Sequence, residues 1–320
     1  MRILLYLLFS FFYLWADAHI FVYHRFDDPR HKTANTTTEQ LIEQFEYFKN
    51  NGYEVVKIEQ ILQKLEQNET IPSHWVALTI DDAYKSFYEN GYKIFKEYNY
   101  PFSLFVYVEA TNKKYGDFMT WDMIKEVSDI GTVGLHSYSH PRLQNLTTQE
   151  VIEDTQKAFD TFKAKLGYEP KIYAYPYGEY TDQVTKTLKQ NFPFQAILNQ
   201  NIGSVNLQSD IFDINRIALV GEVDIEHKLR YNSFDVKWHE PKYFPEDGIL
   251  RKVKASVDPK YTTLNLYITG FGWRDVEVKD GIVDLDLNIY LKNSRTRVML
   301  SSDFFTISNK ILNKTTKKGK

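Results

Sequence analysis

The sequence predicts an α/β fold, in which parallel strands alternate with outer helices, joined to a small C-terminal antiparallel β domain. Short apolar, β-prone runs alternate with segments of helical periodicity over the first two thirds of the chain. Several of these runs end directly in titratable residues, as strands do at the active-site rim of a β/α barrel. After Trp238 a period-two pattern replaces the helical periodicity. An open sheet and a barrel both fit the first part of the chain.

The alternation begins with an apolar strand at residues 19–24 and a helix whose start carries an N-cap signal at residues 36–39. Gly52 is expected to end this helix. Further strands are expected at residues 53–56, 75–80, 102–108, 132–135, 171–174, 194–198 and 214–220. Further helices are expected at residues 58–65, 84–98, 121–127, 148–166 and 182–189. Strands separated by helices in this way are typical of a parallel sheet.

The chain is expected to divide into three parts. Residues 1–18 combine a basic start, an apolar run and an A-x-A pattern, and predict a signal peptide cleaved after Ala18, with an uncleaved anchor as the alternative. Residues 19–237 form the α/β domain, and residues 238–320 form a β-sandwich-like accessory domain that follows a proline-punctuated linker. Its strands are expected at residues 264–269, 276–278, 282–291 and 296–300, and residues 310–320 are expected to be a frayed tail.

Composition narrows the class of protein. The net charge of −3 gives no basic footprint, so nucleic acid is not an expected partner. The chain has no cysteine, which excludes a lipoprotein anchor and disulfides. No second long apolar segment follows the signal peptide, so no integral membrane span is expected after cleavage. The protein is therefore expected to be secreted and to act in the periplasm or at the cell envelope.

The most informative stretch is the strand at residues 75–80, which ends in Asp81 and Asp82. Two adjacent ionised carboxylates repel each other, and a metal cation is the simplest group that offsets the repulsion. One carboxylate would then bind the metal and the other would act as a base. The alternative is that Asp82 only caps the following helix.

Three other strand ends carry candidate residues. His136 and His140 follow one strand at a spacing that lets two imidazoles reach one cation, and with Asp82 they make a two-histidine, one-carboxylate set with open positions. An unrelated pair of surface histidines is the alternative. Residues 175–178 form a turn that could aim the Tyr177 N–H at an oxyanion, or could be a plain strand-to-helix turn. His24 is a candidate proton donor, with a structural histidine as the alternative.

Together these pieces resemble the polysaccharide deacetylases, the NodB-homology family known as carbohydrate esterase family 4. Residues 79–83 (TIDDA) are similar to its first motif, T-F-D-D-G, and residues 136–140 (HSYSH) to its second, H-[ST]-x-x-H. Residues 174–178 (AYPYG) are similar to its third motif, R-x-P-Y-G. The motifs occur in the family's order, and the resemblance covers roughly residues 19–235. It implies a distorted (β/α) barrel of the NodB type.

The resemblance also implies roles for single residues. Asp81 matches the general base, and Tyr177 the residue whose backbone N–H helps to hold the oxyanion. The metal ligands are matched by Asp82, His136 and His140. The implied cofactor is a divalent metal, Zn²⁺ by preference, with Co²⁺ or Ni²⁺ as alternatives.

The chain departs from the family pattern at two positions. Ala83 replaces the usual glycine, which is expected to be a mild change. Ala174 stands where the family commonly has an arginine that orients the base, and Arg216 from a neighbouring strand end is the candidate substitute.

The family's usual downstream L-x-H motif, the source of its catalytic acid, is not recognisable after Tyr177. In lacking this motif the chain resembles the circularly permuted branch of the family that deacetylates biofilm poly-N-acetylglucosamine. In that branch the acid histidine lies in an N-terminal Tyr-His strand end. Tyr23 and His24 are similar to that element, which makes His24 the expected acid.

The implied activity is de-N-acetylation of an N-acetylhexosamine polysaccharide with release of acetate. Peptidoglycan or chitin oligomers as substrates, and a non-catalytic glycan-binding protein, stay open as alternatives. The C-terminal domain is a candidate contact for glycan or export machinery.

Overall fold

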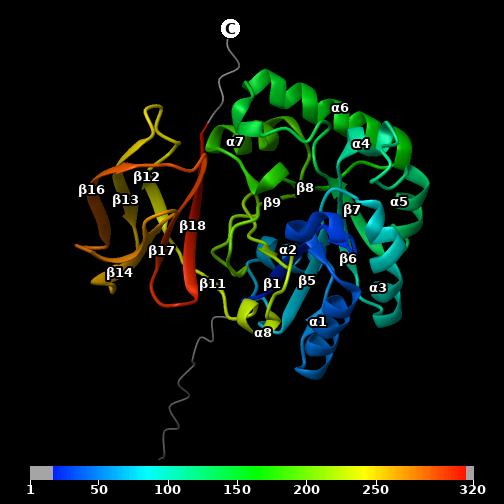
Figure 1. The fold of residues 1–320 in the computed structure, drawn as a ribbon, viewed down its shortest axis with the longest axis horizontal. Helices are drawn as coiled ribbons and strands as arrows, with labels where there is room; N and C mark the ends of the chain where they lie inside the picture. Colours follow the sequence, from blue (N-terminus) through cyan, green and yellow to red (C-terminus); the bar gives the residue numbers. More distant parts are fainter. Residues whose placement is uncertain (1–16, 315–320) are drawn as a thin grey trace, which may run out of the picture.

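The computed structural model describes residues 17–314 and shows two parts, a helix-covered sheet and a β-sandwich (Figure 1). The strands of the first part are β1 (His19–Tyr23), β2 (Arg25–Phe26), β3 (Asn35–Thr36), β4 (Glu54–Val55), β5 (Trp75–Ile80), β6 (Phe102–Val106), β7 (Gly131–Leu135), β8 (Ile172–Ala174), β9 (Ala196–Leu198) and β10 (Ile217–Ala218). Its helices are α1 (Thr38–Asn50), α2 (Ile58–Glu66), α3 (Tyr92–Tyr98), α4 (Val108–Asn112), α5 (Trp121–Val127), α6 (Thr148–Leu166), α7 (Asp182–Asn191) and α8 (Ile225–Lys228).

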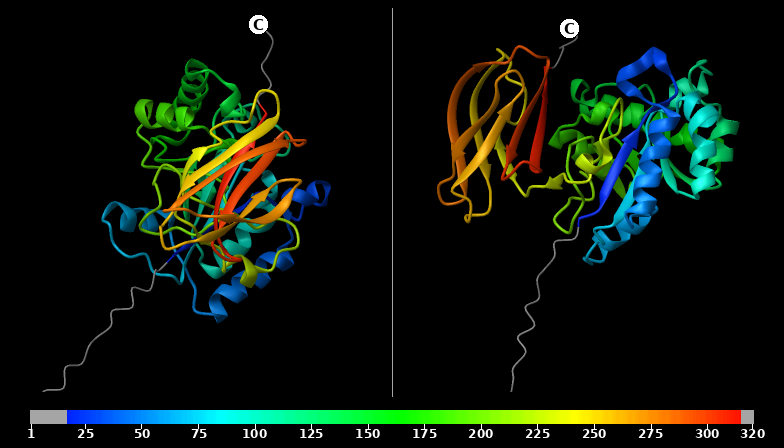
Figure 2. Two further views of the ribbon diagram at one scale, coloured as in Figure 1. Left: turned by 90° about the vertical axis from the view of Figure 1, so that its left-hand side faces the viewer. Right: turned by 60° about the horizontal axis from the view of Figure 1, so that its bottom comes forward.

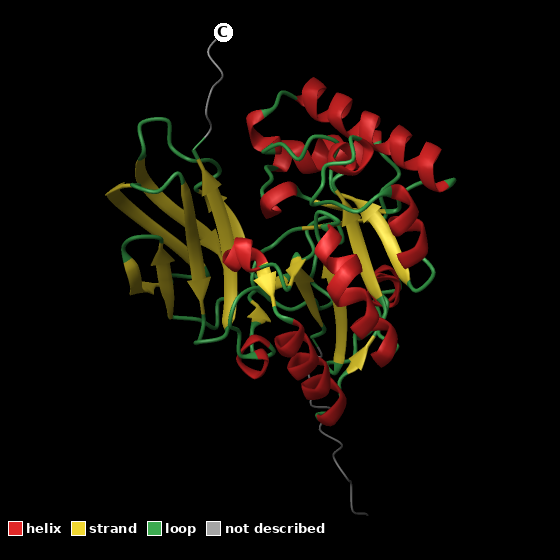
Figure 3. Ribbon diagram, turned by 45° about the vertical axis from the view of Figure 1, so that its right-hand side comes forward, coloured by secondary structure: helices red, strands yellow, loops and turns green. Residues whose placement is uncertain are grey.

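The large sheet is parallel and has the order β10-β1-β5-β6-β7-β8-β9, with β4 paired to β5. The segment between β9 and β10 curls the sheet toward closure, because Leu198 bridges Ile214 and Asn199 N–H donates to Ile214 O at 2.8 Å. Helices cover the outside of this sheet (Figure 3). The predicted α/β fold, a distorted (β/α) barrel with a C-terminal antiparallel β domain, is confirmed.

Local sequence signals account for the best-predicted helices. Thr37 caps α1 in a capping box with Gln40, and Thr147 caps α6 in a capping box with Glu150. Gly167 ends α6 with a φ of 83°. Their apolar faces pack on an aromatic-rich core between sheet and helices, which includes Phe21, Phe26, Phe45, Phe48, Phe87, Phe95 and Phe102. The sheet is thereby held rigidly enough to position side chains at its ends.

The second part consists of two small sheets that enclose a core of their own (Figure 2). Its strands are β11 (Asn232–Ser233), β12 (Lys237–Glu240), β13 (Ile249–Ser256), β14 (Thr263–Ile268), β15 (Gly272–Glu277), β16 (Ile282–Tyr290), β17 (Arg295–Ser301) and β18 (Thr306–Asn313). One sheet has the order β11-β18-β17-β14-β15 and the other β12-β13-β16. β11 pairs in parallel with β18, so residues assigned to the first domain by sequence already belong to the sheet of the second.

Several sequence expectations for single elements were wrong. β18 extends to Asn313, so residues 310–313 are strand and not a frayed tail; their lysine and asparagine content hides the pattern. The strand expected at 102–108 ends at Val106 and is followed by α4. The helix expected at 84–98 is present from residue 85, but it contains a π-helical turn, Phe87–Gly91, before α3. The strand expected at 214–220 is limited to β10.

The expected signal peptide lies mostly outside the described residues, but its last two residues lie inside. Ala18 is fully buried and exchanges two backbone hydrogen bonds with Val205, at 3.0 and 2.8 Å. The Asp17 carboxylate accepts hydrogen bonds from Ser204 Oγ and Asn206 Nδ2. Both residues are therefore built into the first domain. Within residues 17–314, none of the helices combines the length and the apolar character that a membrane crossing requires.

Candidate active site

The carboxyl ends of β1, β5, β7 and β8 meet at one edge of the sheet, and every candidate residue follows one of them. This convergence follows from the parallel order of the strands. Asp81 and Asp82 follow β5, and His136 follows β7. Asp81 N–H donates to Tyr23 O at 3.0 Å, which holds the end of β5 against the end of β1.

Asp82, His136 and His140 form a compact cluster in which all three potential ligand atoms lie within 4.8 Å of one another. Asp82 Oδ1 lies 3.5 Å from His136 Nε2 and 3.1 Å from His140 Nε2. Among the described residues this buried oxygen has no hydrogen-bond partner. A carboxylate oxygen without a donor, facing two imidazole nitrogens, is a donor set that fits a divalent cation.

The protonation of His136 also suits a metal ligand. Its Nδ1 lies 2.8 Å from Ala174 O, and because a carbonyl only accepts, Nδ1 carries the hydrogen and Nε2 keeps its lone pair. Burial lowers the pKa of His136 to about 4, so the imidazole is neutral. Burial alone would raise the pKa of Asp82, but the contact with His140 and the nearby His136 hold it well below its ordinary value. The cluster thus presents two imidazoles and one carboxylate anion.

An unusual backbone turn allows Asp81 and Asp82 to serve the same site. Successive side chains of a strand point to opposite faces. After β5 ends, Asp82 has a φ of 72° and Ala83 a φ of 58°, both in the left-handed region. This turn brings the Asp82 carboxylate to the histidines while Asp81 stays fully buried beside them. Ala83 therefore occupies a conformation that glycine adopts without strain, which explains the family's usual residue there.

Asp81 is held by Arg216, the substitute considered for the arginine missing at Ala174. Arg216 Nη1 donates to Asp81 Oδ1 at 2.7 Å and Nη2 to Oδ2 at 2.9 Å, and both side chains are fully buried. Burial would raise the pKa of Asp81, but Arg216, together with His136 and His24, lowers this pKa below its usual value. Gln200 Nε2 adds a hydrogen bond to Asp81 Oδ2 at 3.0 Å. Gln200 was missed from the sequence, because it lies in an irregular loop without a motif.

Tyr177 and His24 follow two further strands of the sheet, β8 and β1. The Tyr177 ring packs edge-on against His140 at 4.5 Å between ring centroids, and its backbone has a φ of 61°. His24 follows β1 and is close enough to Asp81 and Asp82 for its charge to lower both of their pKa values. His24 Nδ1 has no hydrogen-bond partner among the described residues. The expected candidates are thus all brought to one end of the sheet.

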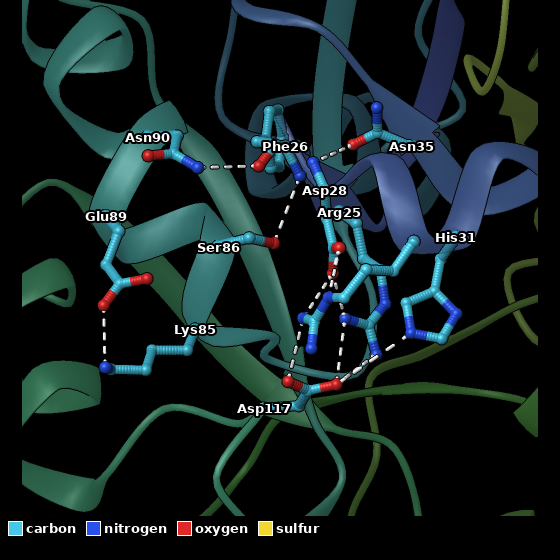
Figure 4. Close-up of polar contacts among 11 residues, drawn as sticks. Arg25, Phe26, Asp28, His31, Asn35, Lys85, Ser86, Glu89, Asn90 and Asp117 are labelled. Carbon is cyan, nitrogen blue, oxygen red and sulfur yellow. Dashed lines mark hydrogen bonds and ion pairs between the residues drawn. The ribbon is translucent and has the colours of Figure 1, made fainter.

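A second acidic group at the rim, formed by Asp28, His31 and Asp117, is a weaker candidate for a cation (Figure 4). Arg30 Nε lies 2.8 Å from Asp28 Oδ1, and Arg30 Nη2 lies 2.9 Å from Asp117 Oδ1. Arg25 pairs with both carboxylates as well, at 2.5 and 3.3 Å. The two arginines already neutralise this group. Since Arg25 directly follows His24, the group anchors the His24 loop to the loop of Asp117.

The sequence is similar to those of known polysaccharide deacetylases. Residues 68–193 match the family model for polysaccharide deacetylases. The chain is 26% identical over 205 residues to the poly-β-1,6-N-acetyl-D-glucosamine N-deacetylase of Escherichia coli K12, which covers 51% of this chain and 30% of that protein. It is 23% identical over 234 residues to the protein of that name from Staphylococcus aureus MSSA476, covering 68% of this chain and 79% of the relative. The chain thus spans less than a third of the length of the Escherichia coli relative.

The fold is shared with solved structures. Streptococcus pyogenes deacetylase PplD, solved in complex with acetate, superposes with a TM-score of 0.62 at 21% identity over 67% of this chain and 97% of that one. Residues 68–193 are therefore similar to the polysaccharide deacetylase family, and the chain shares its fold with a solved deacetylase.

Proposed function

We propose that the chain is a metal-dependent N-deacetylase that removes acetyl groups from a poly-N-acetylglucosamine-like polysaccharide and releases acetate. The observation that carries the proposal is the grouping of Asp82, His136 and His140 beside a carboxylate, Asp81, that is bound by a buried arginine. The choice of polymer rests on the similarity to the poly-β-1,6-N-acetyl-D-glucosamine N-deacetylases of Escherichia coli and Staphylococcus aureus.

The residues of the cluster and Asp81 have different roles in the proposed amide hydrolysis. Asp82, His136 and His140 would hold a divalent cation, with Zn²⁺ as the expected ion and Co²⁺ or Ni²⁺ as alternatives. When bound, such an ion polarises the acetyl carbonyl and makes a water more acidic. Asp81 Oδ1 accepts one hydrogen bond from Arg216 and keeps a second lone pair, which can take a proton from the attacking water.

Two groups complete the reaction. The Tyr177 N–H would donate a hydrogen bond to the oxyanion that develops as water adds to the carbonyl carbon. His24 would donate a proton to the amine nitrogen as the carbon–nitrogen bond breaks, which releases acetate and leaves a free amino sugar. The strained φ of 61° at Tyr177 is consistent with a backbone held for such a task.

The decisive experiment measures acetate release by metal-reconstituted full-length protein. Poly-N-acetylglucosamine oligomers, chitin oligomers, peptidoglycan and acetylated xylan are compared at equal acetyl concentration. The proposal expects the β-1,6-linked oligomers to be the best substrates. Faster release from peptidoglycan or chitin would overturn the choice of polymer, and glycan binding without acetate from any substrate would overturn the enzyme assignment.

His24→Ala is expected to lower turnover by about 10²- to 10⁴-fold, the usual contribution of a positioned acid, while metal content stays unchanged. His74→Ala is the matched control, because His74 is exposed and pairs only loosely with Glu54, at 3.7 Å, before the start of β5. Turnover is measured by acetate release and metal content by elemental analysis. An unchanged rate in His24→Ala would remove His24 from the mechanism, and loss of metal would make it a ligand.

We also propose that the protein is exported and works in the periplasm or at the cell envelope, as the sequence of residues 1–18 predicts. Because Asp17 and Ala18 are packed into the first domain, we expect the leader to be cut before Asp17 and not after Ala18. Amino-terminal sequencing of the exported protein checks this. A mature chain that begins at His19 would contradict the expected cleavage position.

A further inference from the structure

The β-sandwich touches the loops that carry the candidate active site. Figures 1 and 2 show β18, in red, on the side of the sandwich that faces the first domain. Three side chains of β17 and β18 donate hydrogen bonds to the loops that follow β7, β8 and β9: Asn313 to Gln144 at 3.3 Å, Arg295 to Tyr177 O at 3.2 Å, and Asn309 to Asn201 at 2.9 Å. All three contacted loops lie at the carboxyl edge of the sheet, where the cluster is.

Of these three side chains, Arg295 makes the most direct contact with a candidate catalytic residue, Tyr177. Its Nη2 donates to the carbonyl oxygen of Tyr177, and its Nε lies 3.3 Å from Glu179 Oε1. Glu179 is almost completely buried and also pairs with Arg142. The Arg142 guanidinium lies 4.5 Å from the centre of the Tyr177 ring, whose edge packs on His140. One buried carboxylate thus joins the sandwich, the Tyr177 loop and the loop of a candidate metal ligand.

The peptide between Tyr177 and Gly178 is held from both sides. Its carbonyl accepts from Arg295, and its N–H, on Gly178, donates to Tyr175 O at 2.9 Å. Tyr177 needs this support because a φ of 61° is costly for a residue with a side chain. Gly178 is also confined, since a Cβ there would lie 2.6 Å from the Cβ of Gln200. The Tyr177 N–H belongs to the preceding peptide, which is joined to this one at the Tyr177 Cα, so a shift of the backbone here would also displace that N–H.

The hydrogen bond of Asn309 connects the sandwich, through further hydrogen bonds, to Asp81, the proposed general base. Asn309 Nδ2 donates to Asn201, whose N–H donates to Asn199 Oδ1 at 2.7 Å. The carbonyl of Asn199 accepts from Arg216 Nε at 2.7 Å, and Arg216 binds Asp81 through both of its terminal nitrogens. A continuous chain of hydrogen bonds therefore runs from the sandwich to the proposed general base.

We propose that the C-terminal sandwich positions the catalytic loops, with Arg295 as the residue that holds the Tyr177 peptide in place; this rests on the proposed deacetylase function. The sandwich then acts in turnover and not only in glycan binding. Arg295 is a positioning residue, because its contacts are with the Tyr177 carbonyl and Glu179 and it acts through Tyr177. Its side chain is 41% exposed, and Arg142 still pairs with the buried Glu179 carboxylate when Arg295 is removed, so the loss of Arg295 costs little overall stability, whereas it frees the carbonyl of Tyr177.

The test compares Arg295→Ala with wild type in the full-length, metal-reconstituted protein. Arg295→Ala is expected to lower kcat by about 10- to 100-fold, as expected for a misplaced catalytic group, with KM, metal content and thermal unfolding unchanged. Arg251→Ala is the matched control. Arg251 is 60% exposed, and its Nη2 lies 2.6 Å from Asp247 Oδ2, so both partners of this ion pair belong to the sandwich. Added guanidinium should partly restore kcat in Arg295→Ala and have no such effect on the control.

A second measurement does not depend on activity. Amide hydrogen exchange at Gly178 should be about 10-fold faster in Arg295→Ala than in wild type or Arg251→Ala, because the loop opens more often. Unchanged exchange at Gly178, or an unchanged kcat in an active enzyme, would overturn the positioning role. If wild type released no acetate, the proposed function would fall, while the exchange rates would still decide whether Arg295 holds the loop. Equal losses of kcat in Arg295→Ala and Arg251→Ala would also overturn the positioning role, because they would point to a general effect of removing a positive charge.

Discussion

Asp82→Ala should abolish metal binding and acetate release together. Asp82 supplies the carboxylate of the cluster, and its Oδ1 lies between His136 Nε2 and His140 Nε2, at 3.5 and 3.1 Å. Groups that only orient a metal ligand cost about 10- to 100-fold in metal affinity when removed, so loss of the ligand itself should cost more than about 100-fold. Elemental analysis after dialysis against substoichiometric chelator measures the metal, and acetate release measures turnover.

Asp117→Ala is the control for this variant, because Asp117 belongs to the acidic group at the rim that Arg25 and Arg30 already neutralise. It should keep its metal at wild-type stoichiometry. If Asp117→Ala lost the metal and Asp82→Ala kept it, the metal site would have to be assigned to the acidic group at the rim and not to the cluster. Metal retained in both variants would leave Asp82 outside the set of ligands.

Much of the candidate site could be predicted because a parallel sheet gathers its strand ends at one edge. Asp81, Asp82 and His136 directly follow apolar runs in the sequence, so the order of strands alone brings them near one another. Arg216 could be considered because it was expected in a strand of the same sheet; it immediately precedes β10, which pairs with β1, and its long side chain reaches Asp81 from there. Its bidentate contact with Asp81 brings an arginine to this carboxylate although Ala174 supplies none.

Other parts of the site depend on contacts that have no local signal. Gln200 reaches Asp81 from a loop without periodicity, and Arg295 reaches Tyr177 across a sequence separation of 118 residues. The consecutive positive φ values of Asp82 and Ala83 could not be predicted, because alanine does not favour that conformation. The polar residues at the end of β18 suggested a tail, although pairing with β17 makes them a strand. In each case tertiary contacts override local preference.

Asp81→Asn should stop turnover and also destabilise the fold, while the metal stays bound. An amide cannot take the proton from water, so kcat should fall by about 10²- to 10⁴-fold. The substitution also leaves the Arg216 guanidinium fully buried without its anionic partner. Breaking one side of a buried ion pair typically costs about 3–5 kcal/mol, which denaturant unfolding would detect.

The double variant Asp81→Asn/Arg216→Met separates these two effects. Replacing both members of a buried ion pair by groups without charge is often neutral for stability, so the double variant should regain most of the lost unfolding free energy. It should remain inactive, because no group at position 81 can accept a proton. Restored stability without acetate release would assign Asp81 to the chemistry and Arg216 to its support. Acetate release at the wild-type rate by the double variant would show instead that the base lies elsewhere, and that the Asp81–Arg216 pair only holds the ends of β5 and β10 together.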